Sequence, residues 1–242
     1  MIAKVAFISR VNIMSEDCSI SENVQIKENV ILGKGVIIQD YVVIGKKPQR
    51  AKISLFAQAP REFKPTVIGD YVTLCAGAII YAAVELGNNV FVGDYASIRE
   101  NTTVGENTII GRNVTVECDT KIGSNCKIQT GAHITGECVI GDKIFIGPEV
   151  CTTNDSYMAL VDVPMQGPVF EDGCVVGANS TIVPGVRIGK NAIVAAGSVI
   201  FQNVPAEEVW MGNPAKKIAT LKQFMGTAKM FAAKKKSKEN ES

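Results

Sequence analysis

Aliphatic residues recur every six positions over most of the chain, and this periodicity limits the possible fold more than any other feature. The longest uninterrupted run has 14 such residues, and 46% of all residues are hydrophobic. The chance probability of that run is roughly 10⁻⁵, before correction for the choice among six phases of the repeat. Such regularity indicates a repeat architecture in which each unit packs only on its neighbours. The recurring residues, called anchors below, form three blocks: Ile20, Ile26, Leu32, Ile38 and Ile44; Ile68, Leu74, Ile80, Leu86, Val92, Ile98, Val104, Ile110, Val116, Ile122, Ile128, Ile134, Ile140 and Ile146; and Val176, Ile182, Ile188, Val194 and Ile200.

Each repeat has the internal pattern of a short strand followed by a turn. The residue two before the anchor is small or β-branched, as at Ala78, Ala96 and Ala132, and the alternation of a strand points it to the same side as the anchor. Turn-forming residues follow, as in Gly111-Arg112-Asn113. The pattern predicts a solenoid of short parallel strands and excludes an ordinary globular α/β domain. A narrow core of this kind also explains why aromatic residues make up only 6% of the chain.

The composition excludes several functional classes. With 25 Lys and Arg against 24 Asp and Glu, the net charge of +1 does not direct the chain to nucleic acid or to an acidic membrane surface. The single histidine excludes zinc sites with two or three imidazole ligands. Seven cysteines without a CxxC pair are interpreted as reduced thiols. The first residues, MIAKVAFISR, do not resemble a signal peptide, and no apolar run is long enough to span a membrane. We therefore expect a cytoplasmic protein without metal or membrane span.

Two interruptions of the repeat divide the solenoid, which is predicted over residues 1–204. Residues 45–65 and 153–172 break the phase, and long insertions in a solenoid must loop outward, where they usually carry function. Residues 205–233 are predicted to form a C-terminal cap whose segment from 214 on has helical composition. The remaining residues, 234–242, are rich in charge and are predicted to be disordered.

Three stretches give the chain a resemblance to the hexapeptide-repeat acyltransferases: GDYASIRENTTVG, IFIGPEVCTTND, and VAAGSVI followed by MGNPAKKI. The resemblance implies a left-handed parallel β-helix with three hexads in each triangular coil. It also implies a homotrimer with sites between adjacent prisms. Counting 24 anchors then gives an all-β prism of about eight coils, with two outward loops and a short C-terminal helix. Zinc enzymes of the same fold, the γ-type carbonic anhydrases, need three histidines and are excluded.

An 18-residue coil stacks side chains 18 positions apart in columns about 4.8 Å apart. One column, just before the anchors, contains Ser97, Thr115, His133 and Cys151. The two columns that follow the anchors contain Tyr81, Arg99, Glu117, Thr135 and Thr153, and then Glu100, Cys118, Gly136 and Asn154. The sequence thus predicts that the only histidine, two glutamates, an arginine and an asparagine gather along one edge of the prism. Asp94 is expected on a different edge, with Arg112 and Thr130 above it.

These columns supply the candidate site residues. The catalytic candidates are His133, Asp94 and Glu100, where either His133 or a carboxylate takes the proton of the acceptor or the enzyme supplies no base. The resemblance implies that Asp94 and Glu100 hold a sugar near its amine. The candidates for substrate binding are Glu117, Asn154, Asp155, Arg99 and Tyr81. The candidates for cofactor binding are small residues that leave room for a pantetheine arm: Gly177, Ala178, Ala195, Ala196 and Gly197. Lys216 and Lys217 are the candidates for binding the phosphates of the cofactor.

Each of these residues also has a structural interpretation. Arg99 and Glu117 can form a simple ion pair, Asp94 can be a turn residue, and His133 can lie on a surface or a subunit interface. Glu100 at its corner would ordinarily be solvated, and Asn154-Asp155 can form a simple loop turn.

The resemblance implies an acyltransferase that uses acetyl-CoA or another acyl-CoA to acylate the amino group of a nucleotide-linked aminodeoxysugar, such as a dTDP-sugar, in surface polysaccharide or glycan biosynthesis. Acylation of a sugar hydroxyl or of an amino acid is an alternative substrate choice. A non-catalytic β-helix assembly protein is the alternative from a different class. The chemistry requires a proton acceptor, a donor for the oxyanion and precise positioning of the reactants.

Overall fold

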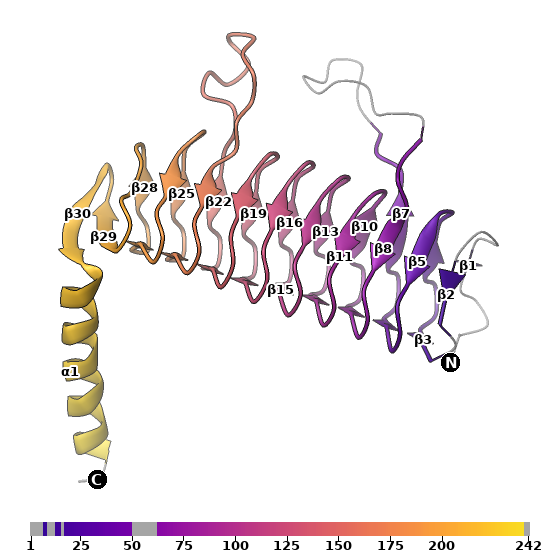
Figure 1. Cartoon of the computed structure of the whole chain (residues 1–242), viewed down its shortest axis with the longest axis horizontal. Helices are drawn as coiled ribbons and strands as arrows, with labels where there is room; N and C mark the ends of the chain where they lie inside the picture. Colours follow the sequence, from indigo (N-terminus) through magenta and orange to yellow (C-terminus); the bar gives the residue numbers. More distant parts are fainter. Residues whose placement is uncertain (1–6, 9–12, 16, 50–61, 240–242) are drawn as a thin grey trace.

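The chain forms a long prism of stacked coils with a helix at its C-terminal end (Figure 1). The structure is a computed structural model that describes residues 7–8, 13–15, 17–49 and 62–239. In this part of the chain, three sheets run along the prism, with 11, 10 and 9 strands, and we call them sheets A, B and C. All strands pair in parallel except the last two of sheet A, which are antiparallel. The predicted all-β parallel solenoid is confirmed.

Most strands are only two or three residues long, as the hexad pattern predicts. Sheet A contains β3 (Ser19–Ile20), β6 (Ile37–Ile38), β9 (Thr73–Leu74), β12 (Phe91–Val92), β15 (Ile109–Ile110), β18 (Lys127–Ile128), β21 (Phe145–Ile146), β24 (Val175–Val176), β27 (Ile193–Val194), β29 (Glu208–Gly212) and β30 (Ala215–Thr220). Sheet B contains β1 (Phe7–Ile8), β4 (Gln25–Ile26), β7 (Val43–Lys46), β10 (Ile79–Tyr81), β13 (Ser97–Ile98), β16 (Thr115–Val116), β19 (His133–Ile134), β22 (Cys151–Thr152), β25 (Thr181–Ile182) and β28 (Val199–Ile200). Sheet C contains β2 (Ile13–Met14), β5 (Val30–Leu32), β8 (Thr66–Ile68), β11 (Glu85–Leu86), β14 (Thr103–Val104), β17 (Lys121–Ile122), β20 (Val139–Ile140), β23 (Val169–Phe170) and β26 (Arg187–Ile188).

The register of the strands confirms the 18-residue coil. In sheet B, Ser97 pairs with Thr115, Thr115 pairs with His133, and His133 pairs with Cys151. The chain turns from sheet A to sheet B, from B to C and from C to A in each coil, and we call the three corners the A–B, B–C and C–A edges. The column of outward residues expected from the sequence is therefore present.

The core is a single aliphatic column inside the prism. The anchors Ile98, Val116 and Ile134 are all fully buried, as are the small residues Ala96 and Ala132 that precede two of them. Because an anchor and the residue two before it face the inside of the prism from the same strand, each side of the triangle contributes one large and one small side chain to the core. Burying such an aliphatic side chain stabilises the fold by about 1.5–3 kcal/mol.

The expected count of about eight coils is too low, because the solenoid has about ten. At the N-terminus, β1 and β2 already pair with β4 and β5, so the repeat begins before residue 18. In the middle, Thr152 and Phe170 occupy anchor positions and are buried, although neither is aliphatic. Thr152 is accommodated because its hydroxyl accepts a hydrogen bond from the Thr135 amide at 2.8 Å and donates one to the His133 carbonyl at 3.1 Å.

Both insertions leave the prism from the B–C edge (Figure 1). The first begins after β7 and ends at β8, and its residues 50–61 lie outside the described part of the chain. The second occupies residues 153–168, which is shorter than the predicted 153–172, because Val169 and Phe170 form β23 and pair with Val139 and Ile140. The sequence pattern missed this strand because a phenylalanine stands where the other repeats have an aliphatic anchor.

The C-terminal cap is a hairpin followed by a helix. Strands β29 and β30 pair antiparallel, so residues 215–220 are a strand where helical composition suggested a helix. Trp210 pairs with Val194 and is buried at the end of the core. Helix α1 spans Leu221–Glu239, which includes residues 234–239 of the tail expected to be disordered. Within the described residues, no helix is long and apolar enough to cross a membrane.

Candidate functional site

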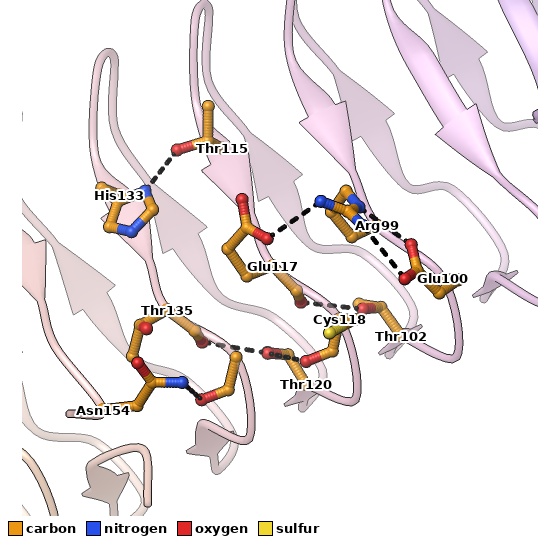
Figure 2. Close-up of polar contacts among 11 residues, drawn as sticks. Arg99, Glu100, Thr102, Thr115, Glu117, Cys118, Thr120, His133, Thr135 and Asn154 are labelled. Carbon is orange, nitrogen blue, oxygen red and sulfur yellow. Dashed lines mark hydrogen bonds and ion pairs between the residues drawn. The ribbon is translucent and has the colours of Figure 1, made fainter. Parts of the chain in front are cut away.

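The B–C edge contains a cluster of charged side chains between the two insertions (Figure 2). Glu100 is 1% exposed and binds Arg99 with both oxygens, at 2.8 Å from Nε and 3.1 Å from Nη2. Arg99 Nη1 also donates to Glu117 Oε2 at 3.3 Å. The hydrogen bonds and charge of Glu100 raise the pKa of Arg99 further, so the guanidinium is permanently charged. The predicted gathering of Arg99, Glu100 and Glu117 on one edge is therefore present, but Glu100 is buried where solvent contact was expected.

Tyr81 extends the cluster toward the first insertion. Lys46 and Arg99 each lie with their charged group 5.0 Å from the centre of the Tyr81 ring. Lys46 comes from the coil before Tyr81, with which it is paired, and Arg99 comes from the coil after it. Cation–π contact with the aromatic ring thus joins three successive coils on the outside of the prism.

His133 lies on the outer face of sheet B and contacts Thr115. The distance from Thr115 Oγ1 to His133 Nδ1 is 2.7 Å, and both side chains are partly buried (Figure 2). No ion pair or hydrogen bond joins His133 to a carboxylate among the residues that the structure describes. The histidine therefore has a neutral hydroxyl as its side-chain partner.

Hydroxyl and amide groups hold the backbone beneath the charged cluster. Thr102 donates to the Glu117 carbonyl at 3.2 Å, Thr120 donates to the Thr135 carbonyl at 3.2 Å, and Asn154 donates to the Gly136 carbonyl at 3.4 Å (Figure 2). Buried Cys118 lies in the same edge. Burial, with help from nearby carboxylates, raises the pKa of this thiol to about 12, so it is neutral at physiological pH.

Asp155 is occupied within the second insertion. Its Oδ1 accepts the Tyr157 amide at 2.8 Å and its Oδ2 accepts the Ala159 amide at 2.7 Å. These hydrogen bonds lower the pKa of the carboxyl group. Both oxygens thus order the loop turn, which corresponds to the structural interpretation of this residue.

Asp94 lies on the A–B edge, as the sequence predicts, and one chain by itself does not bring it to the cluster. It follows β12 of sheet A, whereas Glu100 follows β13 of sheet B. Its carbonyl accepts the Asn113 amide at 2.9 Å in the next coil. The Asp94 carboxylate, after the larger contribution of burial, raises the pKa of Cys75.

The small residues proposed for cofactor binding lie on the A–B edge of the last coils. Gly177 follows β24, and Ala195, Ala196 and Gly197 follow β27. A side chain at Gly177 would collide with the backbone of Ala196, whereas one at Gly197 would meet nothing within 4 Å. The glycine at 177 is therefore required by the stacking of coils, whatever binds outside.

The two lysines predicted to meet phosphates lie on β30 and are exposed. Lys217 Nζ is 2.6 Å from Glu208 Oε1, so its charge is already paired. Lys216 takes part in none of the ion pairs found among the described residues. Of the two, Lys216 has the charge that is available to an anion.

A cavity of about 270 Å³ lies at the base of the first insertion and was not predicted from the sequence. Its charged lining residues are Lys47, Lys64, Glu28 and Glu62, and Phe63 adds an aromatic ring. Lys47 pairs with Glu28 at 2.8 Å and lowers the pKa of that carboxyl group. The sequence did not predict this cavity because residues from separate coils line it.

All seven cysteines are unpaired in the structure. Among the described residues, no three His, Cys, Asp or Glu side chains come together to hold a metal ion. The B–C edge and the adjoining outer face of sheet B present an arginine, carboxylates, hydroxyls and one imidazole.

Comparisons with known proteins identify the repeat. A family model described as "Hexapeptide repeat of succinyl-transferase" matches residues 101–136 and 169–202, and one described as "Bacterial transferase hexapeptide (six repeats)" matches residues 83–118. The chain therefore has the hexapeptide repeat of bacterial transferases, as the resemblance predicts.

A 2,3,4,5-tetrahydropyridine-2,6-dicarboxylate N-acetyltransferase of Staphylococcus aureus is 44% identical over 75 residues. This match covers 31% of the chain and 31% of the relative, so the chain spans about a third of the curated relatives that it matches. The similarity supports the acyl-transferring class.

Two solved structures share the fold at low sequence identity. The LpxA of Acinetobacter baumannii is 17% identical with a TM-score of 0.56, and the match covers 94% of this chain and 77% of that one. The UDP-N-acetylglucosamine acyltransferase of Francisella novicida is 17% identical with a TM-score of 0.54, with coverage of 94% and 73%.

Proposed function

We propose that this protein is an acyl-CoA-dependent N-acyltransferase that transfers an acetyl or other short acyl group to the amino group of a nucleotide-linked aminodeoxysugar. The observation that carries the proposal is the charged B–C edge between two insertions that leave the same edge. Strands β7 and β22, after which the insertions begin, are five strand spacings apart in sheet B, or about 24 Å. That span is long enough for an extended nucleotide-linked substrate.

Glu117 is the carboxylate best suited to contact the amine. Its side chain is 29% exposed, and only its Oε2 binds Arg99. Glu100 has both oxygens on Arg99 and is buried, so we assign it to positioning Arg99 instead of touching the substrate. Arg99, Glu100 and Glu117 together have a net charge of −1, which favours a cationic ammonium group beside Glu117.

The end of the same edge near the first insertion offers cations to the diphosphate of a nucleotide. Lys46 lies on Tyr81, and Lys64 lines the cavity at the base of the first insertion, where Lys47 is paired with Glu28 and Glu62 adds a second carboxylate. Phosphate groups are recognised by such cationic side chains, and aromatic rings provide a surface for stacking. The distribution of charge along the edge therefore orients the substrate, with its phosphates toward the first insertion and its amine toward Glu117 and His133.

The reaction is attack of a neutral amine on the thioester of acyl-CoA. The new C–N bond forms as the C–S bond breaks, and the amine proton passes to a base for which His133 is our candidate. The acyl-CoA would approach along the A–B edge of the last coils, where Lys216 offers an unpaired charge. The oxyanion would be met by a backbone N–H of a glycine-containing turn.

We further infer a left-handed coil and a homotrimer in which Asp94 of one prism completes the site of the next. In support, the outer face of sheet A has four exposed apolar side chains in one column, which also contains Thr73 and Lys127. The four are Ile37, Phe91, Ile109 and Phe145, at 46%, 41%, 37% and 36% exposure. Contact of this face with sheet B of a neighbour is head-to-tail, and three copies would close such a contact into a ring.

The test is release of free CoA from acetyl-CoA and longer acyl-CoAs in the presence of a panel of nucleotide-linked aminosugars. We expect turnover with at least one aminosugar and a loss of about 100-fold in kcat for Glu117→Gln. Glu137→Gln is the matched control, because Glu137 is exposed on the same edge and is outside the site. If calorimetry detects no acyl-CoA binding, the proposal of an acyltransferase is wrong and a non-catalytic assembly protein is favoured.

A second candidate acceptor is an amino acid with two carboxylates. The N-acetyltransferase of Staphylococcus aureus, 44% identical over 75 residues, favours it because that enzyme is named for a tetrahydropyridine dicarboxylate. The net negative charge of Arg99, Glu100 and Glu117 disfavours a dianion at this edge. Turnover of an amino dicarboxylate without turnover of any nucleotide-linked sugar would support this candidate over the first.

A further inference from the structure

Thr115 and His133 form a pair that the strand ladder builds before any ligand binds. They are direct partners in adjacent strands β16 and β19. Their main chains are held by hydrogen bonds from the Thr115 amide to the Ala132 carbonyl at 3.1 Å and from the His133 amide to the Val150 carbonyl at 2.8 Å. A threonine in a strand has few side-chain rotamers, so the position of its hydroxyl is largely set by the backbone.

The contact between the two side chains involves only one ring nitrogen. Thr115 Oγ1 lies 2.7 Å from Nδ1, at the short end of the range for a hydrogen bond to nitrogen. Among the described residues, Nε2 of His133 has no hydrogen bond. In Figure 2 this second nitrogen lies on the side of the ring away from Thr115. The pair therefore leaves Nε2 to a ligand.

A hydroxyl can donate or accept, so the pair permits two tautomers. If Thr115 donates to Nδ1, then Nε2 has the ring proton and acts only as a donor. If Nδ1–H donates to Thr115, then Nε2 has a lone pair and the threonine proton turns to solvent, which its partial exposure allows. Only the second arrangement gives a base.

We propose that Thr115 is a positioning residue whose hydroxyl oxygen accepts a hydrogen bond from Nδ1–H of His133 and so holds the imidazole with a free lone pair on Nε2. The catalytic meaning of this assignment rests on the proposed acyl transfer. In that reaction, Nε2 takes the proton as the amine nitrogen bonds to the acyl carbon. The same proton then passes to the CoA sulfur as the C–S bond breaks, so His133 returns to its starting state.

A hydroxyl partner also differs in charge from a carboxylate partner. A carboxylate on Nδ1 would stabilise the imidazolium and add negative charge to an edge that already contains Glu100 and Glu117. In the proposed arrangement, Thr115 accepts from Nδ1–H without either effect. This explains how a histidine can serve as a base here although no carboxylate among the described residues binds it.

The tautomer can be measured directly because the chain has a single histidine. In protein labelled with ¹⁵N-histidine and studied where the ring is neutral, one pair of ring signals should show a protonated Nδ1 and an unprotonated Nε2. Thr115→Ser should retain this pattern, because the hydroxyl remains. Thr115→Val should shift the ring toward the Nε2-protonated tautomer, because its acceptor is lost. A wild-type ring protonated on Nε2, or an unchanged spectrum in Thr115→Val, would overturn the proposal.

Kinetics separate this proposal from the proposed function. Thr115→Val should lower kcat on the order of 10-fold with little change in KM, and Thr115→Ser should restore most of the rate. Thr103→Val is a matched control, because Thr103 is partly exposed at the equivalent outer position of sheet C and should change neither spectrum nor rate. If the expected tautomer is found but His133→Ala retains full turnover, the pairing stands and the assignment of His133 as the base fails.

Discussion

The B–C edge and the A–B edge of the last coils are made by the same six-residue repeat, yet they differ in how they fill a corner. At the B–C edge, Glu100 is buried against Arg99, and Glu117 and Tyr81 complete a stack of interacting side chains. At the A–B edge of the last coils, Gly177 packs so closely on Ala196 that no side chain fits. One corner thus consists of paired side chains and the other of backbone. The comparison teaches that the repeat can bury a charge in a corner where an adjacent side chain of the same coil supplies the opposite charge, with a second contact from the next coil.

The largest effect should follow from Glu100→Gln. Loss of the carboxylate leaves the partly buried guanidinium of Arg99 with an amide group in place of its two-oxygen partner, and with only the more exposed Glu117 as an opposite charge. We expect the free energy of unfolding in urea to fall by about 3 kcal/mol. This value is near the lower end of the range for removing one partner of a buried ion pair, because Arg99 reaches solvent. Glu28→Gln is the control and should leave stability unchanged, because both side chains of the Glu28–Lys47 ion pair are exposed to solvent. Equal losses in the two variants would contradict the buried role of Glu100.

The second prediction tests the backbone packing of the A–B edge. Gly177→Ala should destabilise the fold by about 2 kcal/mol, because the new methyl group meets the Ala196 backbone. Gly197→Ala should cost about 1 kcal/mol, because its positive φ strains an alanine while the space around it is open. Urea unfolding of the two variants measures the difference. A larger loss at Gly197 would show that backbone conformation, and not coil stacking, limits this edge.

A third prediction concerns alkaline pH and the thiol beneath the B–C edge. Cys118 has a pKa of about 12 in the folded chain, whereas an unfolded thiol has one near 9.0. Because the folded pKa is the higher, the contribution of Cys118 to stability is complete below pH 9.0 and is lost as the pH rises toward 12. Cys118→Ala should therefore lose stability less steeply with pH over this window. Parallel curves for the two proteins would show that Cys118 ionises in the folded chain as readily as in the unfolded one.

The smallest effect is expected at the lysines beyond the A–B edge. Lys216→Ala should raise the KM for acyl-CoA by about 3-fold at low salt, because an exposed charge contributes modestly to phosphate binding. Lys217→Ala should have less effect, since Lys217 is already paired with Glu208. Initial rates at several acyl-CoA concentrations measure both. A stronger effect at Lys217 would mean that its pair with Glu208 opens when the donor binds.

Much of the architecture could be predicted from the sequence because a hexad is a local rule. Alternation and turn residues gave the strands, and the spacing of 18 placed Thr115, His133 and Cys151 in one column. The rule failed where another interaction satisfied an anchor position. Thr152 is buried because its hydroxyl is hydrogen-bonded to the backbone, and Phe170 is buried because its ring is apolar. Since neither residue is aliphatic, the sequence pattern missed their two strands and counted too few coils.

The candidate site was predictable to the level of an edge and not of individual contacts. The columns brought Arg99, Glu100 and Glu117 together, but the sequence did not distinguish the buried glutamate from the exposed one. Thr115 was placed in the column of His133 without being recognised as its partner. The cavity near Lys47 and Lys64 was missed because it is lined by separate coils and an insertion.

The sequence by itself determined the repeat, the direction of each side chain and the edge on which the functional groups gather, because these depend on short-range backbone geometry. Only the tertiary structure decided that Glu100 is buried on Arg99, that Thr115 contacts Nδ1 of His133, and that residues 215–220 form a strand. These outcomes depend on how the coils and the hairpin pack, because packing decides which side chains lose contact with solvent. It also decides which groups of other coils come within hydrogen-bond distance.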